Sequence, residues 1–361
     1  MTARRSVRRA LVPLAAGLTI SLAGCGGGGS TASSADNAKL DAMSMSQLAK
    51  EAAKEGSVTW YTTFTQDDVQ PMIAAFNKVY PDIKVNALRL SADKIPARIM
   101  TEQRGGKYNA DVVSGDSPQV AQLLEAGALQ PYTPTTAAKL PAGLSLPKGY
   151  EGVIYALGTA IVYNPTVVKE KGLPVPTTWE DLTKPAWKGK FSIDPEAINW
   201  YDALIHSMGH AKALDLVKRL GANDPVFVES HTQAITDVQA GEPAATATGY
   251  GYKAAELAEK TPSRLAFVNT NPLPTSLNLV DVVKGAPHPA AARLFEDWIV
   301  SKQGQQEVID VTNHTSIRTD VKNDPKVWNE SKWKNVYGDP VLKPSVYNSE
   351  LSELKGALGA P

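Results

Sequence analysis

The chain has 361 residues, with 37 basic and 37 acidic side chains and a single cysteine. A chain of this length exceeds one ordinary hydrophobic core, so we expect two lobes, each with its own buried interior. Four of the basic residues lie in residues 1–24, which hold no acidic residue, so the remainder has 33 basic against 37 acidic side chains. This mildly acidic balance argues against nucleic acid or an anionic membrane surface as a partner of the folded part.

The N-terminus has the pattern of an export signal. Residues 1–25 run from paired arginines through an apolar stretch to small residues before Cys25. The apolar stretch is too short to span a membrane. Residues 22–25 read LAGC and resemble the lipobox of bacterial lipoproteins, which implies cleavage before Cys25 and lipidation of its sulfur. We therefore predict a signal peptide over 1–24, then the lipidated cysteine and a flexible Gly/Ser tether over 25–47.

From Ser57 onward, predicted strands and helices alternate, which favours an α/β fold with mostly parallel sheets. The first series comprises a strand over 57–64, a helix opened by Asp67 and Asp68, a strand over 83–90, a helix over 95–106, a strand from 110 and a helix over 118–127. The second series comprises a strand pair or one bulged strand over 156–165, a strand, loop and helix over 189–206, a capped helix over 229–242, a strand and loop over 243–252, a strand over 277–286 and two helices over 289–309.

Several strings resemble those of a known family. They are VTWYTTFT at 58–65, FNKVYPDIKV at 76–85, ADVVSGDSPQVAQL at 110–123, LPVPTTWEDLTKPAWKGKFSIDP at 173–195, DVQAGE at 237–242 and KGAPHPAAARLFEDWIVSKQGQQ at 284–306. In combination they resemble the extracytoplasmic solute-binding proteins of ABC importers, in the branch that includes ferric-iron binders. The resemblance covers about residues 56–317. It implies a two-lobed periplasmic-binding-protein-like fold with a hinge, a ligand cleft between the lobes, and closure on binding.

This resemblance also implies partners and domain bounds. We assign one lobe to residues 48–158 plus about 272–310, and the other to 159–271 plus about 311–361. The expected partners are a small-molecule solute, an ABC permease with its cytoplasmic ATPase, and the outer face of the cell membrane through the lipid anchor. We expect a monomer without a cofactor and without enzymatic activity.

A lipid-anchored hydrolase is the rival class of protein. The chain has no G-x-S-x-G motif, and none of its five histidines lies in a local nucleophile signature. A triad assembled from distant residues stays open. His206 and His210 could reach one zinc ion from a continuous helix, but the string HSMGH lacks the glutamate of a metalloprotease motif. Since Gly209 is expected to end the helix between them, we predict no zinc site.

Four predicted loops follow strands at the expected cleft, over residues 62–65, 114–117, 194–200 and 248–252. The start of a predicted helix at 230–232 is a fifth segment expected there. Open α/β sheets bind ligands at the carboxyl ends of their strands, and free amides at helix starts suit anionic or hydroxylated ligands. The candidate ligand contacts are Thr62, Thr63, Asp116, Thr159, Asn199, Trp200, His231, Thr232, Thr248, Tyr250 and Tyr252. For Asp116 and Thr232, capping of their own helices is the competing interpretation.

Ferric-iron members of the family use a first-loop histidine, a second-loop carboxylate, an adjacent tyrosine pair and an anion-holding arginine. The matching positions here are Thr65 for the histidine, Gly115 or Asp116 for the carboxylate, Tyr250 and Gly251 for the tyrosine pair, and Thr159 or Ala160 for the arginine. These departures favour a small organic or anionic solute over bare ferric iron. The alternative is Fe(III) held by Asp116, Tyr250 and Tyr252.

The backbone conformation of the segment GYGY sets the relative direction of its two tyrosine side chains. If residues 250–252 are extended, Tyr250 and Tyr252 point the same way, because residues two apart in a strand share a face. They would then form an aromatic wall for an organic ligand, with Trp200 opposite.

Overall fold

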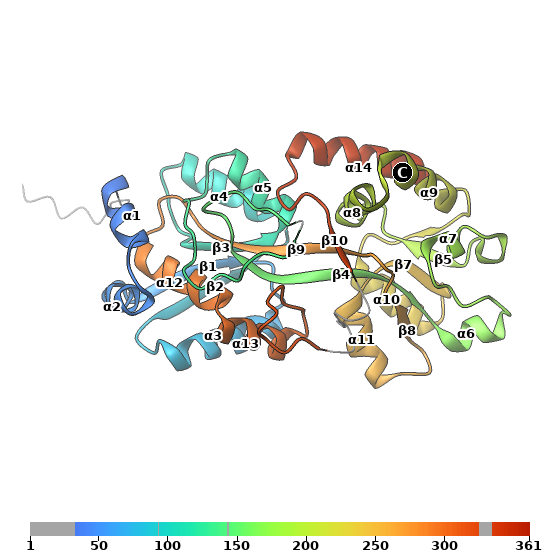
Figure 1. Ribbon diagram of the computed structural model, residues 1–361, viewed down its shortest axis with the longest axis horizontal. Helices are drawn as coiled ribbons and strands as arrows, with labels where there is room; N and C mark the ends of the chain where they lie inside the picture. Colours follow the sequence, from blue (N-terminus) through green and yellow to red (C-terminus); the bar gives the residue numbers. More distant parts are fainter. Residues whose placement is uncertain (1–32, 93, 143, 325–333) are drawn as a thin grey trace, which may run out of the picture. The chain divides into compact units, whose positions relative to one another are not determined.

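The computed structural model describes residues 33–92, 94–142, 144–324 and 334–361. Cys25 and the predicted signal peptide lie outside these residues, so the predicted cleavage and lipidation stay predictions. The described chain is a mixed α/β structure (Figure 1). None of the helices in these ranges is long and apolar enough to cross a membrane.

Two helices occupy part of the segment that we predicted to be a tether. α1 (Ser34–Asp41) begins at a capping box between Ser33 and Asp36, and α2 (Met45–Glu55) packs on α12 (Pro289–Val300). The buried guanidinium of Arg293 in α12 holds α1 by donating to Asp41 at 2.7 Å and to Asn37 at 2.9 Å. The predicted tether is therefore wrong from Ser34 onward, because the capping box and this ion pair order the chain.

The strands of the described chain form one mixed sheet in the order β2–β1–β3–β9–β4–β7–β5–β6, with β10 on β9 and β8 on β4. Their bounds are β1 Ser57–Thr62, β2 Lys84–Arg89, β3 Val112–Asp116, β4 Val153–Tyr163, β5 Phe191–Ile193, β6 Val226–Phe227, β7 Ala245–Tyr250, β8 Ala266–Val268, β9 Leu273–Val282 and β10 Asn335–Tyr337. Strands pair in parallel at both ends of the sheet. The prediction of mostly parallel pairing is wrong at the centre of the sheet. There β9 is antiparallel to both of its neighbours, β3 and β4, and β4 is antiparallel to β7.

Strand β4 changes partners along its length. Up to Gly158 it pairs with β9, and from Thr159 it pairs with β7 and then β8. Its register shifts twice, so the bulged strand is the correct one of the two predicted alternatives. Figure 1 shows β4 and β9 running alongside each other between the strands β1–β3 and the strands β5–β8. We call the region around β1–β3 the first lobe and the region around β5–β8 the second lobe.

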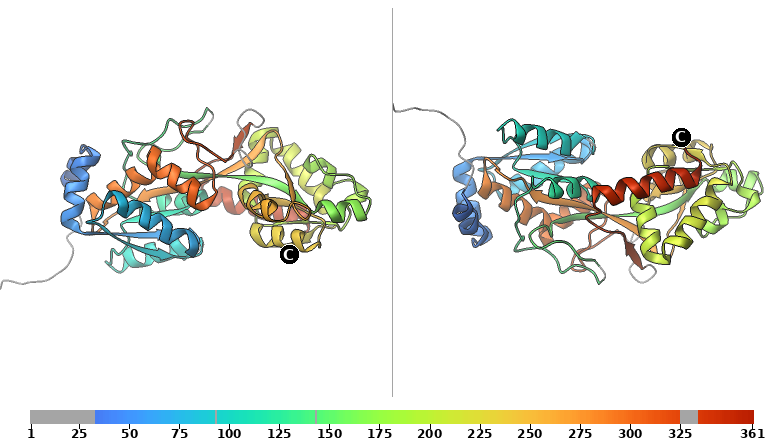
Figure 2. Two further views of the ribbon diagram at one scale, coloured as in Figure 1. Left: turned by 90° about the horizontal axis from the view of Figure 1, so that it is seen from below. Right: turned by 90° about the horizontal axis from the view of Figure 1, so that it is seen from above.

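The first-lobe strands bury their two faces in two different cores. Val58 and Trp60 of β1 pack in a core with Phe295, whereas Tyr61, the residue after Trp60, packs in a second core with Ile99. This alternation is what a strand covered on both faces requires. The first core is covered by α2, α3 (Gln66–Val79), α12 and α13 (Lys302–Thr312), and the second by α4 (Lys94–Arg104) and α5 (Ser117–Glu125), as Figure 2 shows.

The second lobe repeats this arrangement. Ile161 of β4 faces the core of α6–α9 and α14, and the adjacent Val162 faces α10 and α11. The helix bounds are α6 Pro165–Glu170, α7 Trp179–Leu182, the 3-10 helix η1 Pro185–Trp187, α8 Ile198–Met208, α9 His210–Gly221, α10 His231–Ala240, α11 Gly251–Lys260 and α14 Pro344–Leu358. Gly209 separates α8 from α9, as predicted, so His206 and His210 lie on different helices.

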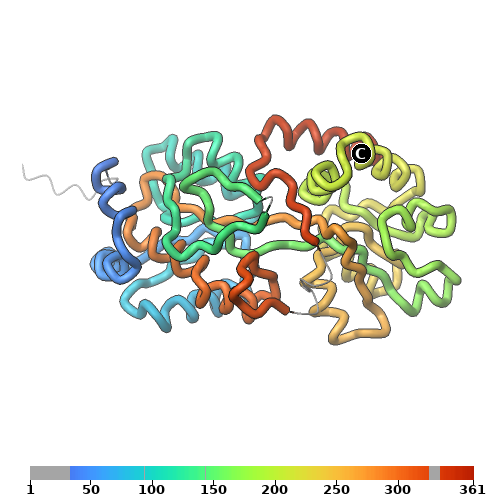
Figure 3. Tube along the Cα trace, viewed as in Figure 1, coloured from blue at the N-terminus to red at the C-terminus, as the bar shows by residue number. Residues whose placement is uncertain are grey.

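The C-terminal segment divides between the lobes. α14 lies beside α8 and α9 (Figure 3), and Glu353 accepts from His210 at 2.7 Å. Ile317, in contrast, packs with Leu277 in a first-lobe core. The assignment of all residues from 311 to the second lobe is therefore too broad, because the chain leaves α13 within the first lobe.

Candidate functional site

The rings of Tyr250 and Tyr252 lie side by side. Tyr250 ends β7, and Tyr252 lies in the first turn of α11, which follows directly. The ring centres are 6.1 Å apart and the planes differ by 27°. The predicted loop over 248–252 is therefore absent, and a strand-to-helix junction, rather than an extended segment, brings the two phenols together.

Four further rings extend this pair into what we call the aromatic row: His231, Tyr250, Tyr252, His314, Tyr155 and Phe64. The ring centres are 4.2 Å apart for His231 and Tyr250, 4.0 Å for Tyr252 and His314, 3.9 Å for His314 and Tyr155, and 5.5 Å for Tyr155 and Phe64. The row starts on α10 of the second lobe and ends after β1 of the first lobe. It therefore connects the two lobes through ring contacts.

Asp116 lies near the middle of the aromatic row. It is the N-cap residue of α5, but its side chain makes no capping hydrogen bond. Instead, the Asn278 amide donates to Asp116 at 3.0 Å and to Thr63 at 3.3 Å. Burial raises the pKa of Asp116, whereas the hydrogen bond from Asn278 and the nearby His231 lower it. The capping interpretation therefore fails for this carboxyl group.

A second carboxyl group, Asp194, lies at the second-lobe end of the row. His231 Nδ1 donates to the Thr248 carbonyl, which directs its Nε2 toward Asp194 at 3.7 Å. Thr248 Oγ1 accepts from the Asp194 amide at 2.9 Å. Burial raises the pKa of Asp194, and the nearby His231 opposes this effect. Thr248 thus positions both members of the pair.

The three tyrosines of the row and His314 are neutral near neutral pH. Burial raises the pKa values of Tyr155, Tyr250 and Tyr252, and the Asp116 carboxylate raises all three further. Burial lowers the pKa of His314 to about 3. The site therefore offers uncharged aromatic faces next to carboxyl groups.

Two predicted contacts lie away from the row. Trp200 is 1% exposed and packs at 5.8 Å from Trp179 in the core of the second lobe. The prediction that it faces the tyrosines is wrong, because α8 turns this side chain inward. Asn199, next to it, lines a separate cavity of about 10 Å³ with Ser117 and Thr275.

The predicted threonines support the site or lie outside it. Buried Thr62 accepts from Ser114 at 2.8 Å and from the Phe64 amide at 3.0 Å, so it shapes the turn that places Phe64. Thr159 is buried in β4 opposite Tyr250 of β7. Thr232 is exposed on α10.

Sequence reasoning missed four residues of the site: Tyr155, His314, Asn278 and Asp194. Tyr155 and Asn278 lie within long apolar strands, where local pattern cannot separate a ligand contact from a core residue. Asp194 belongs to a predicted cleft loop, and His314 was one of the five histidines considered for catalysis. Only the packing of β4, β9 and the segment after α13 brings these residues together.

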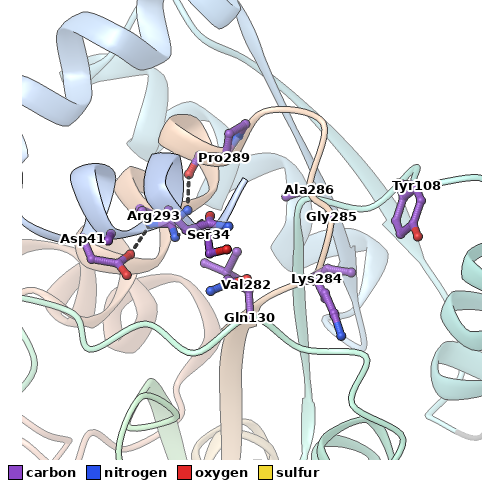
Figure 4. A pocket seen from close by; sticks show the side chains of 13 residues that line it. Ser34, Asp41, Tyr108, Gln130, Val282, Lys284, Gly285, Ala286, Pro289 and Arg293 are labelled. Atoms are coloured by element: carbon purple, nitrogen blue, oxygen red, sulfur yellow. Dashed lines mark hydrogen bonds and ion pairs between the residues drawn. The ribbon is translucent and has the colours of Figure 1, made fainter. Parts of the chain in front are cut away.

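Within the described ranges, no group of three or more His, Cys, Asp or Glu side chains could hold a metal ion. A cavity of about 410 Å³ lies elsewhere, between α1 and the chain that precedes α12 (Figure 4). Its lining includes Tyr108, Lys284 and Arg293, but the Arg293 guanidinium is bound by Asp41 and the Pro289 carbonyl. This cavity therefore offers no free arginine to a solute.

The chain is similar to proteins that are known from sequence. A family model described as bacterial extracellular solute-binding protein matches residues 71–335. An uncharacterised protein of Haemophilus influenzae is 29% identical over 268 residues, which is 71% of this chain and 76% of that protein. Iron uptake protein A1 of Synechocystis is 28% identical over 240 residues, 62% of this chain and 65% of that protein.

A solved structure shows the same fold. The periplasmic binding protein AfuA from Actinobacillus pleuropneumoniae, with fructose-6-phosphate bound, superposes with a TM-score of 0.72 at 22% identity. The match covers 85% of this chain and 99% of that one. The predicted two-lobed periplasmic-binding-protein-like α/β fold is therefore confirmed.

Proposed function

This chain belongs to the family of bacterial extracellular solute-binding proteins, and we propose that it captures a small organic solute at the aromatic row and delivers it to a membrane permease. The observation that carries the proposal is the row itself. Rings from both lobes meet beside Asp116, so a solute held there would contact both lobes at once. A ligand that contacts both lobes favours the closed arrangement.

The local chain supports binding rather than turnover. His231 is held by Thr248 and Asp194, and Nδ1 of buried His314 has no hydrogen-bond partner, so among the described residues neither ring hydrogen-bonds to a serine, threonine or cysteine side chain. We propose that the protein is not an enzyme. Its partners are then the solute, an ABC permease and its ATPase.

Ferric iron is the alternative ligand, and the name of the Synechocystis relative favours it. Asp116, Tyr250 and Tyr252 would supply three oxygen atoms to the metal. An octahedral Fe(III) ion needs more hard ligands than these, and burial opposes ionisation of both phenols by raising their pKa values. We therefore rank an organic solute above bare iron.

The experiment that separates these functions uses the purified protein with candidate solutes. A binding protein shifts its tryptophan fluorescence, gains thermal stability by mass action, and returns the solute unchanged in mass spectrometry. A chemically altered solute would exclude the binding-only function. A coloured, stoichiometric complex with ferric citrate, lost in Tyr250→Ala, would replace the organic solute by iron.

A further inference from the structure

We propose that the solute is an organic cation, with an ammonium or quaternary ammonium group seated among the tyrosines of the aromatic row. The inference deepens the proposed function and rests on it, since it concerns the same site. It goes further by assigning the charge of the ligand.

The charges around the row are predominantly negative. The charged groups acting on Asp116, Tyr250 and Tyr252 are the carboxylates of Asp68, Asp116, Asp194 and Glu256, with His231 as the one basic group; none of the described arginines is among them. The positive charge of Lys253, the residue after Tyr252, lowers the pKa of His314 in the row and opposes the rise in the pKa of Asp68, and the same ammonium is paired with Glu256 at 2.8 Å. A phosphate or carboxylate ligand would therefore meet like charges without an arginine to hold it.

A buried acceptor points to a donor on the ligand. Both contacts of the Asn278 side chain are made by its Nδ2, toward Asp116 and Thr63. Its Oδ1 is buried and has no hydrogen-bond partner within the described chain. Buried polar atoms are normally paired, so this oxygen and the Asp116 carboxylate form an acceptor pair that suits an N–H donor.

The rings supply the other half of cation recognition. Tyr250 and Tyr252 are neutral phenols, whose faces attract a cation within about 6 Å of the ring centre, whereas His314 covers one face of Tyr155. The stacked contact of Tyr155 with His314 and the near-parallel pair of Tyr250 and Tyr252 fix the rings in place. Aromatic faces with a nearby carboxylate are an arrangement that selects organic cations over neutral sugars and anions.

The test is a binding titration of the purified protein with five probes. Choline, putrescine and spermidine represent organic cations, fructose 6-phosphate represents anions, and ferric citrate represents iron. The variants are Asp116→Asn, which removes the charge and keeps the shape, and Tyr252→Leu, which removes a ring. Asp67→Asn is the matched control, because Asp67 is an exposed carboxylate in the first turn of α3.

We expect at least one cation to bind the wild type, and both site variants to weaken its binding at least tenfold while Asp67→Asn stays at the wild-type affinity. Thermal unfolding without probe checks that each variant is folded. Failure of all three cations to bind would overturn the assignment, as would cation binding that survives both site variants. Binding of fructose 6-phosphate or ferric citrate that depends on Asp116 and Tyr252 would also overturn the cation class, but it would leave solute capture at this site intact.

Discussion

Asp281 of β9 and Glu296 of α12 are carboxyl groups buried in the first lobe, away from the aromatic row. Burial raises the pKa of Asp281 to about 8, and the nearby Glu151 contributes to the shift. Burial also raises the pKa of Glu296 well above its usual value, with Asp281 and Asp297 adding to it. The folded protein therefore keeps protons on this pair at pH values where the unfolded chain has lost them.

This pair predicts a pH dependence of stability. Between the unfolded pKa of 3.8 and the folded value of about 8, the native state binds more protons than the unfolded state, so the free energy of unfolding falls as pH rises. Asp281→Asn removes this contribution. Urea unfolding at pH 5 and pH 8 measures the effect. The free energy of unfolding of the variant minus that of wild type should be about 2–4 kcal/mol larger at pH 8 than at pH 5.

Asp82→Asn, which changes an exposed carboxyl group, serves as the control. Its difference from wild type in the free energy of unfolding should change little between the two pH values. An equal difference between Asp281→Asn and wild type at pH 5 and pH 8 would show that Asp281 ionises normally in the fold.

At the scale of elements, the contact between α12 and α13 depends on Gly304. A Cβ atom at this position would lie 2.0 Å from the Trp298 carbonyl oxygen and 2.8 Å from the Ile299 Cα. Both are backbone atoms, so the helices must move apart. Gly304→Ala should destabilise the protein by about 1–3 kcal/mol, as overpacking does.

Gly356 in α14 is the matched control. A Cβ atom there has nothing within 4 Å, so Gly356→Ala should stabilise the helix by about 0.5–1 kcal/mol. Chemical denaturation of both variants measures the two effects. A destabilised Gly356→Ala together with an unchanged Gly304→Ala would contradict the packing described.

How far the sequence predicts the elements follows from the range of the interactions involved. The helix at 231–240 was predictable because Ser230 accepts from the Gln233 amide and Gly241 takes a left-handed φ of 109°. The antiparallel pairing of β4 with β9 was not, since it joins residues more than a hundred positions apart. Trp200 was misplaced for the same reason: only tertiary contacts decide which face of α8 is buried.

At the scale of the whole molecule, anchoring and solute capture are separate predictions. If Cys25 is lipidated, Cys25→Ala should leave an uncleaved, unlipidated precursor that is not retained at the membrane through a lipid anchor. Fractionation of cells that express wild type and variant, with detection of the incorporated lipid, measures this. Equal lipid labelling of the two proteins would exclude Cys25 as the attachment site. Solute binding by the purified folded part should be the same in both.

The central claim is that the solute binds at the aromatic row rather than at the cavity near α1. Tyr250→Leu/Tyr252→Leu removes two rings of the row, whereas Tyr108→Leu changes the cavity of about 410 Å³. Each ring lost from a ligand contact should cost about 1–3 kcal/mol of binding energy. Thermal unfolding of the free proteins establishes that both variants keep the fold.

The most direct measurement is native mass spectrometry of wild type and both variants after incubation with one mixture of amines, sugar phosphates and ferric citrate. Wild type and Tyr108→Leu should each carry one added small molecule per chain, which is released unchanged on denaturation, and the Tyr250→Leu/Tyr252→Leu variant should carry none. Retention of the ligand by the double variant, or its loss in Tyr108→Leu, would contradict the assignment of the row as the solute site.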